Sequence, residues 1–338
     1  MFEKALSALD DGVMILDHDQ KLLYANPALA RLAGEELSYI IGRQLLEVIR
    51  SPELADLAAQ LSGANQARET EFSLLFPQKL ILLASAYPIP EGAVVILRDV
   101  TEIKRLENLR HEFVANVSHE LKTPLTAIRN YVETLLDGAV DDPSHKKAFL
   151  QKIEKNALNL SNLINDILAI SKIEGRREYG TFSPVDLFKV AGKVAAELAD
   201  RAAAKKISIQ LLGAADLFIT NGVEDQLYRA MINLLDNAIN YSPPGGTIKV
   251  ACQRRGEAIE FSVEDNGIGI PPEHLDRIFE RFYRVDKGRS RELGGTGLGL
   301  AIVKHIMGLH SGFVRVESEE GKGSRFYLVF PQKEFTSF

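Results

Sequence analysis

The chain has 338 residues, of which 46% are hydrophobic, so it is long enough for two or three domains that each bury a core. The first 100 residues hold 8 Lys and Arg against 14 Asp and Glu, whereas the remainder balances at 32 of each. Because no part of the chain is strongly basic, nucleic-acid binding is disfavoured, and a single cysteine, Cys252, excludes a disulfide framework and a cysteine-based metal cluster.

The sequence contains no run of 18 apolar residues, and residues 1–12 lack the apolar core of a signal peptide. We therefore expect no transmembrane segment in this chain. We expect a cytoplasmic location, which the single cysteine also fits, or membrane association if the chain is a shortened form of a longer protein.

Residues 1–100 read as a small α+β domain. Residues 12–26 form two β-rich runs around the polar turn His18-Asp19, which predicts a hairpin, and short helical stretches follow. Three further strand-length runs, at residues 71–76, 79–89 and 92–100, alternate or are apolar throughout. An antiparallel sheet that ends near Asp99 is the natural arrangement of these strands.

Residues 101–178 change to a helical period, with apolar positions spaced by three or four from Ile103 to Val132. The first helix is expected to end near Gly138. Asp142 and Pro143 then provide a cap and a first helical residue for a second helix that runs to Gly175. Two long helices with a short loop predict an antiparallel hairpin, and their uncovered apolar stripes predict a homodimer closed as a four-helix bundle. Residues 179–338 alternate helices and strands as a separate α/β domain.

One histidine in the first helix stands out, because His119 lies two residues past the apolar seam and should face solvent. Glu120 flanks it, Thr123 shares its helix face one turn on, and Pro124 removes a helical N–H beside it. A proline inside a helix costs roughly 3 kcal/mol, so a functional bend explains it better than an incidental kink on a solvated face. The neighbouring pair His111-Glu112 lacks the Thr-Pro that follows His119.

The stretch SHELKTPLTAI, residues 118–128, resembles the phospho-acceptor motif of sensor histidine kinases. The resemblance implies that a ring nitrogen of His119 attacks the terminal phosphate of ATP. It also implies that Glu120 orients the ring through its other N–H, and that Thr123 holds the water that removes phosphate from a partner protein.

Four later segments carry polar and glycine-rich patterns suited to a nucleotide: residues 233–246, 263–270, 278–305 and 320–326. Amides one turn apart on a helix can hold the shell of a metal ion and phosphate oxygens, and basic residues before a glycine-rich helix start predict an ATP lid. The lid is not a Walker A loop, because no Gly-Lys-Ser/Thr follows its glycines at that spacing.

In this order the four segments resemble the N, G1, F and G2 boxes of the Bergerat-type ATP-binding domain, an α/β sandwich. The resemblance implies that Asp265 accepts the adenine amino group, Tyr241 packs by the base, and Asn237 ligates Mg²⁺ with support from Asn233. It assigns the remaining nucleotide contacts to Arg284, Lys287, Gly267, Gly269, Gly295, Thr296, Gly297, Leu298, Gly299 and Ser324. Many members carry lysine where this chain has Asn240, so basic side chains elsewhere must supply that charge.

The resemblance also implies a function for the whole chain. A phosphohistidine on His119 would pass its phosphoryl group to an aspartate of a separate response regulator, since no receiver domain is visible, and the kinase would also act as a phosphatase of that regulator. Residues 1–100 resemble a PAS domain, and several stretches look most like the phosphate-regulon type of sensor kinase. The PAS region holds no cysteine and only His18, which argues against a flavin–cysteine adduct and against haem.

Two alternatives remain open at this point. A Bergerat-fold ATPase would need a glutamate as general base where this chain has Asn233. A non-catalytic PAS scaffold would have no need of intact nucleotide segments. The signal, the identity of the regulator, and whether phosphate moves within or between subunits are not encoded in any of these motifs.

Overall fold

The structure is a computed structural model that describes residues 2–60, 66–75, 78–174, 180–213, 217–286 and 295–331. The chain divides into two compact units, Met1–Val114 and Ala115–Phe338. A long helix, α6, begins in the first unit and continues into the second.

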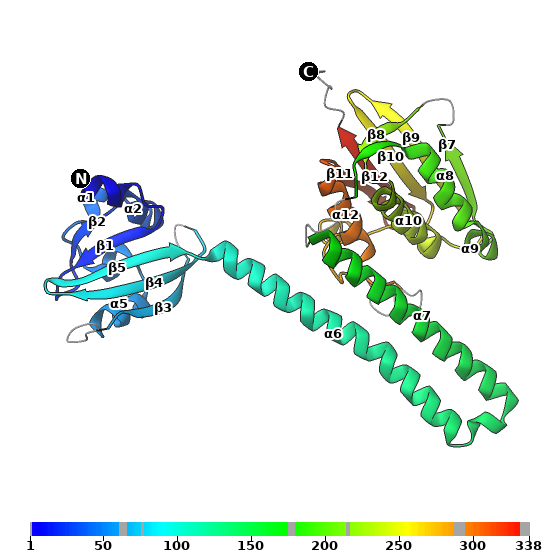
Figure 1. Ribbon diagram of the computed structural model, residues 1–338, viewed down its shortest axis with the longest axis horizontal. Coiled ribbons are helices and arrows are strands. Elements are labelled where there is room, and N and C mark those ends of the chain that lie inside the picture. The colour runs from blue at the N-terminus through cyan, green and yellow to red at the C-terminus, as the bar shows by residue number, and fades with distance from the viewer. Residues whose placement is uncertain are drawn as a thin grey trace. The chain divides into compact units, whose positions relative to one another are not determined.

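The first unit is built on a five-stranded antiparallel sheet (Figure 1). Its strands run in the order β2-β1-β5-β4-β3. The predicted hairpin is confirmed, because β1 pairs with β2 across a turn in which the Asp17 carboxylate accepts the N–H groups of Asp19 and Lys21. The strand bounds are β1 Gly12–Leu16, β2 Leu22–Ala25, β3 Arg68–Leu74, β4 Leu80–Ile89 and β5 Gly92–Asp99.

In the described part of the first unit, five short helices accompany this sheet, and apolar side chains of the sheet and of α2 to α5 form one core. Asn26 is fully buried at the start of α2: its side-chain oxygen accepts from the N–H groups of Val13 and Leu29, and its amide donates to two backbone carbonyls. A buried amide with all its hydrogen bonds made is a structural device. The helices are α1 Phe2–Ser7, α2 Pro27–Ala33, α3 Leu37–Ile40, α4 Leu45–Val48 and α5 Pro52–Ala59.

The helical hairpin consists of α6, Thr101–Leu136, and α7, Pro143–Glu174, which lie antiparallel and side by side (Figure 1). Each helix ends within two residues of its predicted end. Pro124 lies inside α6, and no side chain of this helix, all of which the structure describes, is buried in the single chain. The apolar stripe that a partner helix pair would cover is therefore present, and the homodimer stays a prediction.

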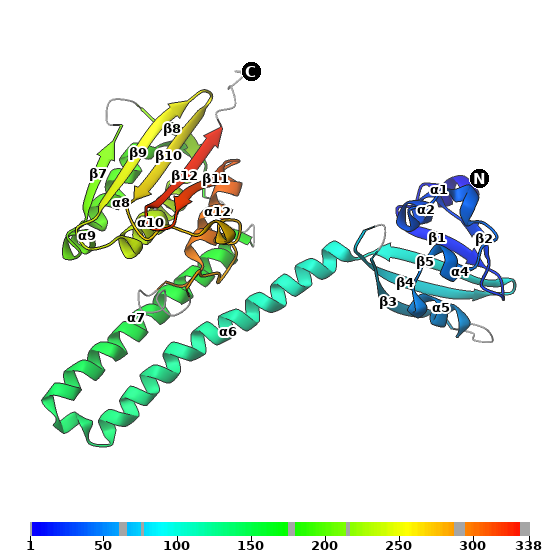
Figure 2. The ribbon, with the colours of Figure 1, turned by 180° about the vertical axis from the view of Figure 1, so that it is seen from behind.

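The rest of the second unit is a two-layer α/β sandwich (Figure 2). Its five-stranded sheet has the order β11-β12-β10-β9-β7, with β7 parallel to β9 and the other pairs antiparallel. A separate two-stranded sheet pairs β6 with β8. The strand bounds are β6 Ser183–Asp186, β7 Ser208–Leu212, β8 Ile219–Gly222, β9 Thr247–Arg255, β10 Ala258–Asp265, β11 Phe313–Glu319 and β12 Gly323–Pro331.

The helices of this sandwich present apolar faces to the sheet. Leu227, Met231 and Leu234 on α10 are buried, as are Phe261 and Phe330 on the sheet. This packing leaves the polar face of α10 for the site described below, since residues three and four apart share one side of a helix. The helices are α8 Leu187–Glu197, α9 Ala199–Ala204, α10 Glu224–Tyr241, η2 Pro272–His274 and α12 Gly299–Leu309.

Candidate functional site

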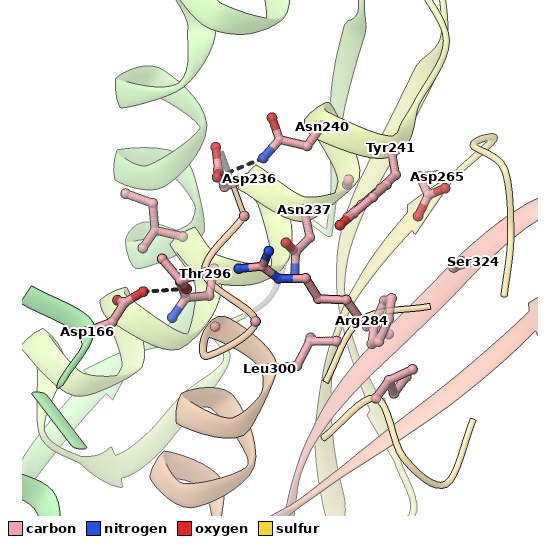
Figure 3. A pocket seen from close by; sticks show the side chains of 18 of the residues that line it. Asp166, Asp236, Asn237, Asn240, Tyr241, Asp265, Arg284, Thr296, Leu300 and Ser324 are labelled. Atoms are coloured by element: carbon pink, nitrogen blue, oxygen red, sulfur yellow. Dashed lines mark hydrogen bonds between the residues drawn. The ribbon is translucent and has the colours of Figure 1, made fainter. Parts of the chain in front are cut away.

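A cavity of about 820 Å³ lies beside α10 in the second unit and is here named the α10 cavity. It is bounded by α7, α10, the end of β10 and the start of α12 (Figure 3). Most of the predicted nucleotide-binding residues line it: Asn233, Asn237, Tyr241, Asp265, Gly269, Arg284, Gly295, Thr296, Gly297, Gly299 and Ser324. The structure thus brings together residues from four separated sequence segments.

Three predicted residues do not line the α10 cavity or cannot be placed in it. Gly267 lies behind Asp265: its N–H donates to Asp265 Oδ1 at 2.8 Å, and an added Cβ would lie 2.6 Å from that oxygen. Leu298 is fully buried, and its N–H donates to Thr296 Oγ1 at 3.2 Å. Both residues therefore support lining residues. Lys287 lies outside the described residues.

Asp265 ends β10 at one end of the α10 cavity, near Tyr241 and Ser324 (Figure 3). Burial is the largest influence on this carboxyl and raises its pKa to about 6, although hydrogen bonds from the backbone of Gly267 and Ser324 act in the opposite direction. The chain thus keeps an acceptor in a partly desolvated place, which suits hydrogen bonding to a ligand amino group.

Glycines allow the backbone to pass close to other segments around the cavity. Gly269 and Gly297 have φ of +68° and +72°, where other residues are strained. A Cβ at Gly269 would lie 2.0 Å from the Glu319 carbonyl oxygen, and one at Gly297 would lie 2.9 Å from the backbone of Phe282. Helix α12 begins at Gly299, so its N-terminal N–H groups are available to an anion.

The side-chain amides of α10 provide oxygen atoms that could act as metal ligands in the same cavity. Asn233 and Asn237 line the cavity one turn apart, and Asn233 Nδ2 is buried without a hydrogen-bond partner among the described residues. A Cβ at Gly299 would lie 3.3 Å from Asn233 Oδ1. Amide oxygens are ligands that Mg²⁺ accepts, usually together with phosphate oxygens and water. In the described ranges, no group of three or more His, Cys, Asp or Glu side chains could hold a metal ion.

Three arginines from the described part of the chain line the α10 cavity, and each is paired with a carboxylate. Arg284 Nη2 lies 3.2 Å from Glu120 Oε2, and the Arg284 side chain is only 7% exposed. Arg229 pairs with Asp166 at 3.0 Å, and Arg201 pairs with Asp236. The sequence motifs did not identify Arg201, Arg229 or Asp166, because none of them belongs to the glycine-rich or asparagine-rich segments.

Arg201 lies where the sequence departs from the family pattern. Its Nη2 donates to Asn240 Oδ1 at 3.3 Å, and Asn240 Nδ2 donates to Asp236 Oδ2 at 3.1 Å. A guanidinium from α9 therefore lies beside Asn240, the position at which the resemblance implies a lysine in many members of the family. Arg201 is therefore a candidate for the basic side chain that was expected to supply this positive charge.

His119 is exposed, with 68% of its side chain accessible. Its Nδ1 lies 3.7 Å from Glu120 Oε1, which is an ion-pair distance and too long for a hydrogen bond. Thr123 Oγ1 donates to the His119 carbonyl oxygen at 3.1 Å, a common contact of a threonine four residues on in a helix. Glu120 thus lies between the His119 ring and Arg284 of the α10 cavity.

The size and chemistry of the cavity fit a nucleotide. A volume of about 820 Å³ lies within the range of small-molecule and cofactor sites. The cavity has a carboxylate at one end, amide oxygens and an arginine along α10, and glycines at the start of α12. These are the kinds of group that suit a base, a metal ion and phosphates.

Comparison with protein families divides the chain into three matches. Residues 6–105 match the PAS fold, residues 109–176 match the His Kinase A (phospho-acceptor) domain, and residues 222–334 match the Histidine kinase-, DNA gyrase B-, and HSP90-like ATPase family. Together with the observed helices and sheets, these matches confirm the predicted multidomain fold class.

Curated relatives and solved structures give the same result. The chain is 36% identical over 328 residues to the phosphate regulon sensor protein PhoR of Pseudomonas aeruginosa, covering 97% of this chain and 73% of that protein. It is 41% identical over 240 residues to the sensor-like histidine kinase SenX3 of Mycolicibacterium smegmatis, covering 71% of this chain and 62% of that protein. The chain therefore spans part of the length of each.

Two solved structures share its fold. The histidine kinase AdeS of Acinetobacter baumannii aligns with a TM-score of 0.51 and 26% identity, over 64% of this chain and 98% of that one. The histidine kinase ThkA, solved in complex with the response regulator protein TrrA, aligns with a TM-score of 0.56 over 99% of both chains, and its 21% identity shows the fold alone. Among the residues that the structure describes, no helix combines the length and the apolar character needed to cross a membrane.

Proposed function

The chain belongs to the sensor histidine kinases of two-component systems and is a protein-histidine kinase, and from that premise we propose that His119 takes the terminal phosphoryl group of ATP bound in the α10 cavity. One observation carries this assignment. Glu120, the neighbour of His119, is bound through its other carboxylate oxygen to Arg284, which lines the cavity. His111 is also followed by a glutamate, but it lacks the threonine and proline that follow His119 four and five residues on.

The reaction forms one bond and breaks one. A lone pair of the imidazole attacks the γ-phosphorus, and the bond from that phosphorus to the bridging oxygen breaks, so ADP leaves with the electron pair. Because Nδ1 faces Glu120, Nε2 is the attacking atom and Glu120 stabilises the positive charge or accepts the proton of the Nδ1–H group. Phosphoryl transfer of this kind depends mainly on alignment and charge neutralisation.

The lining residues divide the work along the cavity. Asp265 accepts the hydrogen bond of the adenine amino group beside Tyr241 and Ser324, while Arg284 and Arg201 neutralise phosphate charge. Asn237, supported by Asn233, would hold Mg²⁺, which would supply positive charge that neutralises the phosphates. The phosphates lie against the backbone of the remaining described residues of the predicted set, which are Gly269, Gly295, Thr296, Gly297 and Gly299.

The phosphohistidine then passes its phosphoryl group to an aspartate of a separate response regulator. The same kinase also hydrolyses the phosphoryl group from the regulator, using a water molecule held by Thr123. Support for the first step comes from the family and from ThkA, which was solved with a response regulator. A homodimer is supported by the match to the phospho-acceptor domain and by the exposed apolar stripe of α6. The cytoplasmic location stays a prediction.

Two other functions of this fold are disfavoured by particular residues. An ATPase that activates water needs a base at the first asparagine of α10, and the amide of Asn233 cannot accept a proton. A non-catalytic scaffold does not explain the glycines whose replacement would collide with backbone around the cavity, such as Gly269.

Incubation of the purified chain with γ-labelled ATP and Mg²⁺ tests the proposal. We expect acid-labile, base-stable label on the wild-type protein, no label on His119→Gln, and full label on the matched control His111→Gln. Binding of ADP should survive in both variants. Label retained by His119→Gln would move the acceptor elsewhere, and free phosphate without protein label would favour the ATPase.

A further inference from the structure

A carboxylate on the second hairpin helix, α7, accepts hydrogen bonds from two side chains that line the α10 cavity. Asp166 Oδ2 accepts from Thr296 Oγ1 at 2.8 Å, and Asp166 Oδ1 accepts from Arg229 Nη2 at 3.0 Å (Figure 3 shows the first contact). The same Arg229 nitrogen donates to the Asn165 carbonyl oxygen at 3.0 Å. The Asp166 side chain is 17% exposed, so water weakens these contacts less than at an open surface. Asp166, Thr296 and Arg229 are named here the Asp166 latch.

The contact between Glu120 and Arg284 follows the same pattern on the first hairpin helix. In both places the acceptor is a hairpin carboxylate, and the donors belong to the sandwich and line the α10 cavity. Arg284 and Thr296 both belong to the segments proposed to hold phosphates. The hairpin therefore binds the same kind of donor that a phosphate chain requires.

Carboxylate and phosphate oxygens compete for such donors, because both are anionic acceptors and a hydroxyl proton serves one strong acceptor at a time. A triphosphate that recruits Thr296 and the nearby arginines must weaken their bonds to Asp166 and Glu120. Conversely, a hairpin that holds these donors makes phosphate binding less favourable.

We propose that the Asp166 latch, together with the Glu120–Arg284 pair, couples the two events, so that binding of nucleotide phosphates in the α10 cavity detaches the sandwich from the hairpin. This inference rests on the proposed function. It assigns Asp166 as a positioning residue that acts through Thr296 and Arg229, and it makes the docked arrangement the nucleotide-poor state. Detachment would let the sandwich move relative to His119 before transfer.

Coupling of this kind is reciprocal. If bound phosphates weaken the contacts of the Asp166 latch by some factor, removal of the latch must raise the affinity for phosphates by the same factor. The base contributes nothing to the competition, since Asp265 and Tyr241 lie at the other end of the cavity (Figure 3). Affinity for ADP should therefore respond to the latch, and affinity for adenosine should not.

Equilibrium titration of the full chain with Mg-ADP and with adenosine tests this without turnover. For Asp166→Ala we expect the ADP affinity to rise about fivefold to tenfold, a size typical of coupling between sites, with adenosine affinity unchanged. The matched control is Glu133→Ala, which removes a hairpin carboxylate paired with Arg129 on its own helix, and both affinities should stay as in the wild type. An unchanged or weaker ADP affinity in Asp166→Ala, or an equal gain for adenosine, would overturn the proposal.

A second measurement needs no variant. Amide hydrogen exchange of the wild-type chain over residues 162–170 should accelerate when Mg-ADP is added and stay constant when adenosine is added at equal saturation. Equal protection with ADP and with adenosine would overturn the latch even if Asp166→Ala failed to fold. Failure of the proposed function looks different, because the wild type would then bind neither ligand or would carry no label on His119.

Discussion

Replacement of Asp265 by asparagine should move stability and nucleotide affinity in opposite directions. Burial raises the pKa of the carboxyl from 3.8 to about 6 in the folded protein without nucleotide. A raised folded-state pKa contributes stability at low pH that is lost as pH rises through the folded value. Since one pKa unit corresponds to about 1.4 kcal/mol, the ionised wild-type carboxylate lowers the free energy of unfolding by about 3 kcal/mol above pH 6.

Asparagine does not titrate, so the variant avoids this loss. Between pH 4.5 and pH 7 the free energy of unfolding of Asp265→Asn, relative to the wild type, should rise by about 2 kcal/mol and then level off. Affinity for ADP should fall about 10-fold to 100-fold, because a hydrogen bond to a charged acceptor contributes about 1.5–3 kcal/mol.

Exchange of the buried α10 amides, corrected for the intrinsic effect of pH, measures the unfolding of this part of the chain. Titration with ADP at pH 7.5 measures the affinity. Asp225→Asn is the matched control, since Asp225 is an exposed carboxylate that lines the same cavity. A stability difference between Asp265→Asn and the wild type that stays constant from pH 4.5 to 7 would refute the burial argument. Unchanged ADP affinity would refute the role in adenine binding.

Two further substitutions test single contacts. Arg201→Ala should lower the affinity for ATP several-fold and leave that for adenosine unchanged, and adding Asn240→Lys should restore ATP binding in titrations; equal losses for both ligands would reduce Arg201 to a structural partner of Asp236. His310 is buried, with its pKa lowered mainly by desolvation, and its Nε2 accepts from the Val223 N–H at 3.0 Å. A lowered histidine pKa contributes stability that is present above about pH 6.5 and is lost as pH falls. His310→Leu should therefore lower the free energy of unfolding by about 1–3 kcal/mol at pH 8 and by less at pH 5.5, measured in the same exchange assay. A difference between variant and wild type that does not change with pH would contradict this.

Local patterns in the sequence were sufficient for the elements and for most of the cavity. The three-and-four spacing of apolar residues placed both hairpin helices within two residues of their observed ends, and the glycine-rich and asparagine-rich segments line one cavity. The strand predicted to begin at residue 71 begins at Arg68, because Arg68 to Thr70 pair with β4 although their side chains are polar. Pairing with a neighbouring strand decided that boundary, and sequence period does not record it.

The residues that the sequence did not reveal were missed for a different reason. Asp166, Arg229 and Arg201 lie in ordinary amphipathic helices, where a charge at the surface is the usual interpretation. Their roles appear only when the fold brings α7, α9 and α10 to one cavity, so that each charge meets an opposite one across separate elements. The ion pair between Glu120 and Arg284 was missed for the same reason, since Arg284 lies 164 residues further along the chain.

The pairing of every described arginine in the α10 cavity follows from the cost of burial. An arginine as enclosed as Arg284 would lose hydration without compensation if it waited alone for a phosphate, and an unpaired buried charge is strongly destabilising. A carboxylate neighbour removes that cost in the absence of nucleotide. A triphosphate carries more negative charge than one carboxylate and can replace it. Two of the three carboxylates, Glu120 and Asp166, belong to the hairpin that bears His119. If phosphates replace these carboxylates as partners of the arginines, the sandwich loses two of its contacts with that hairpin.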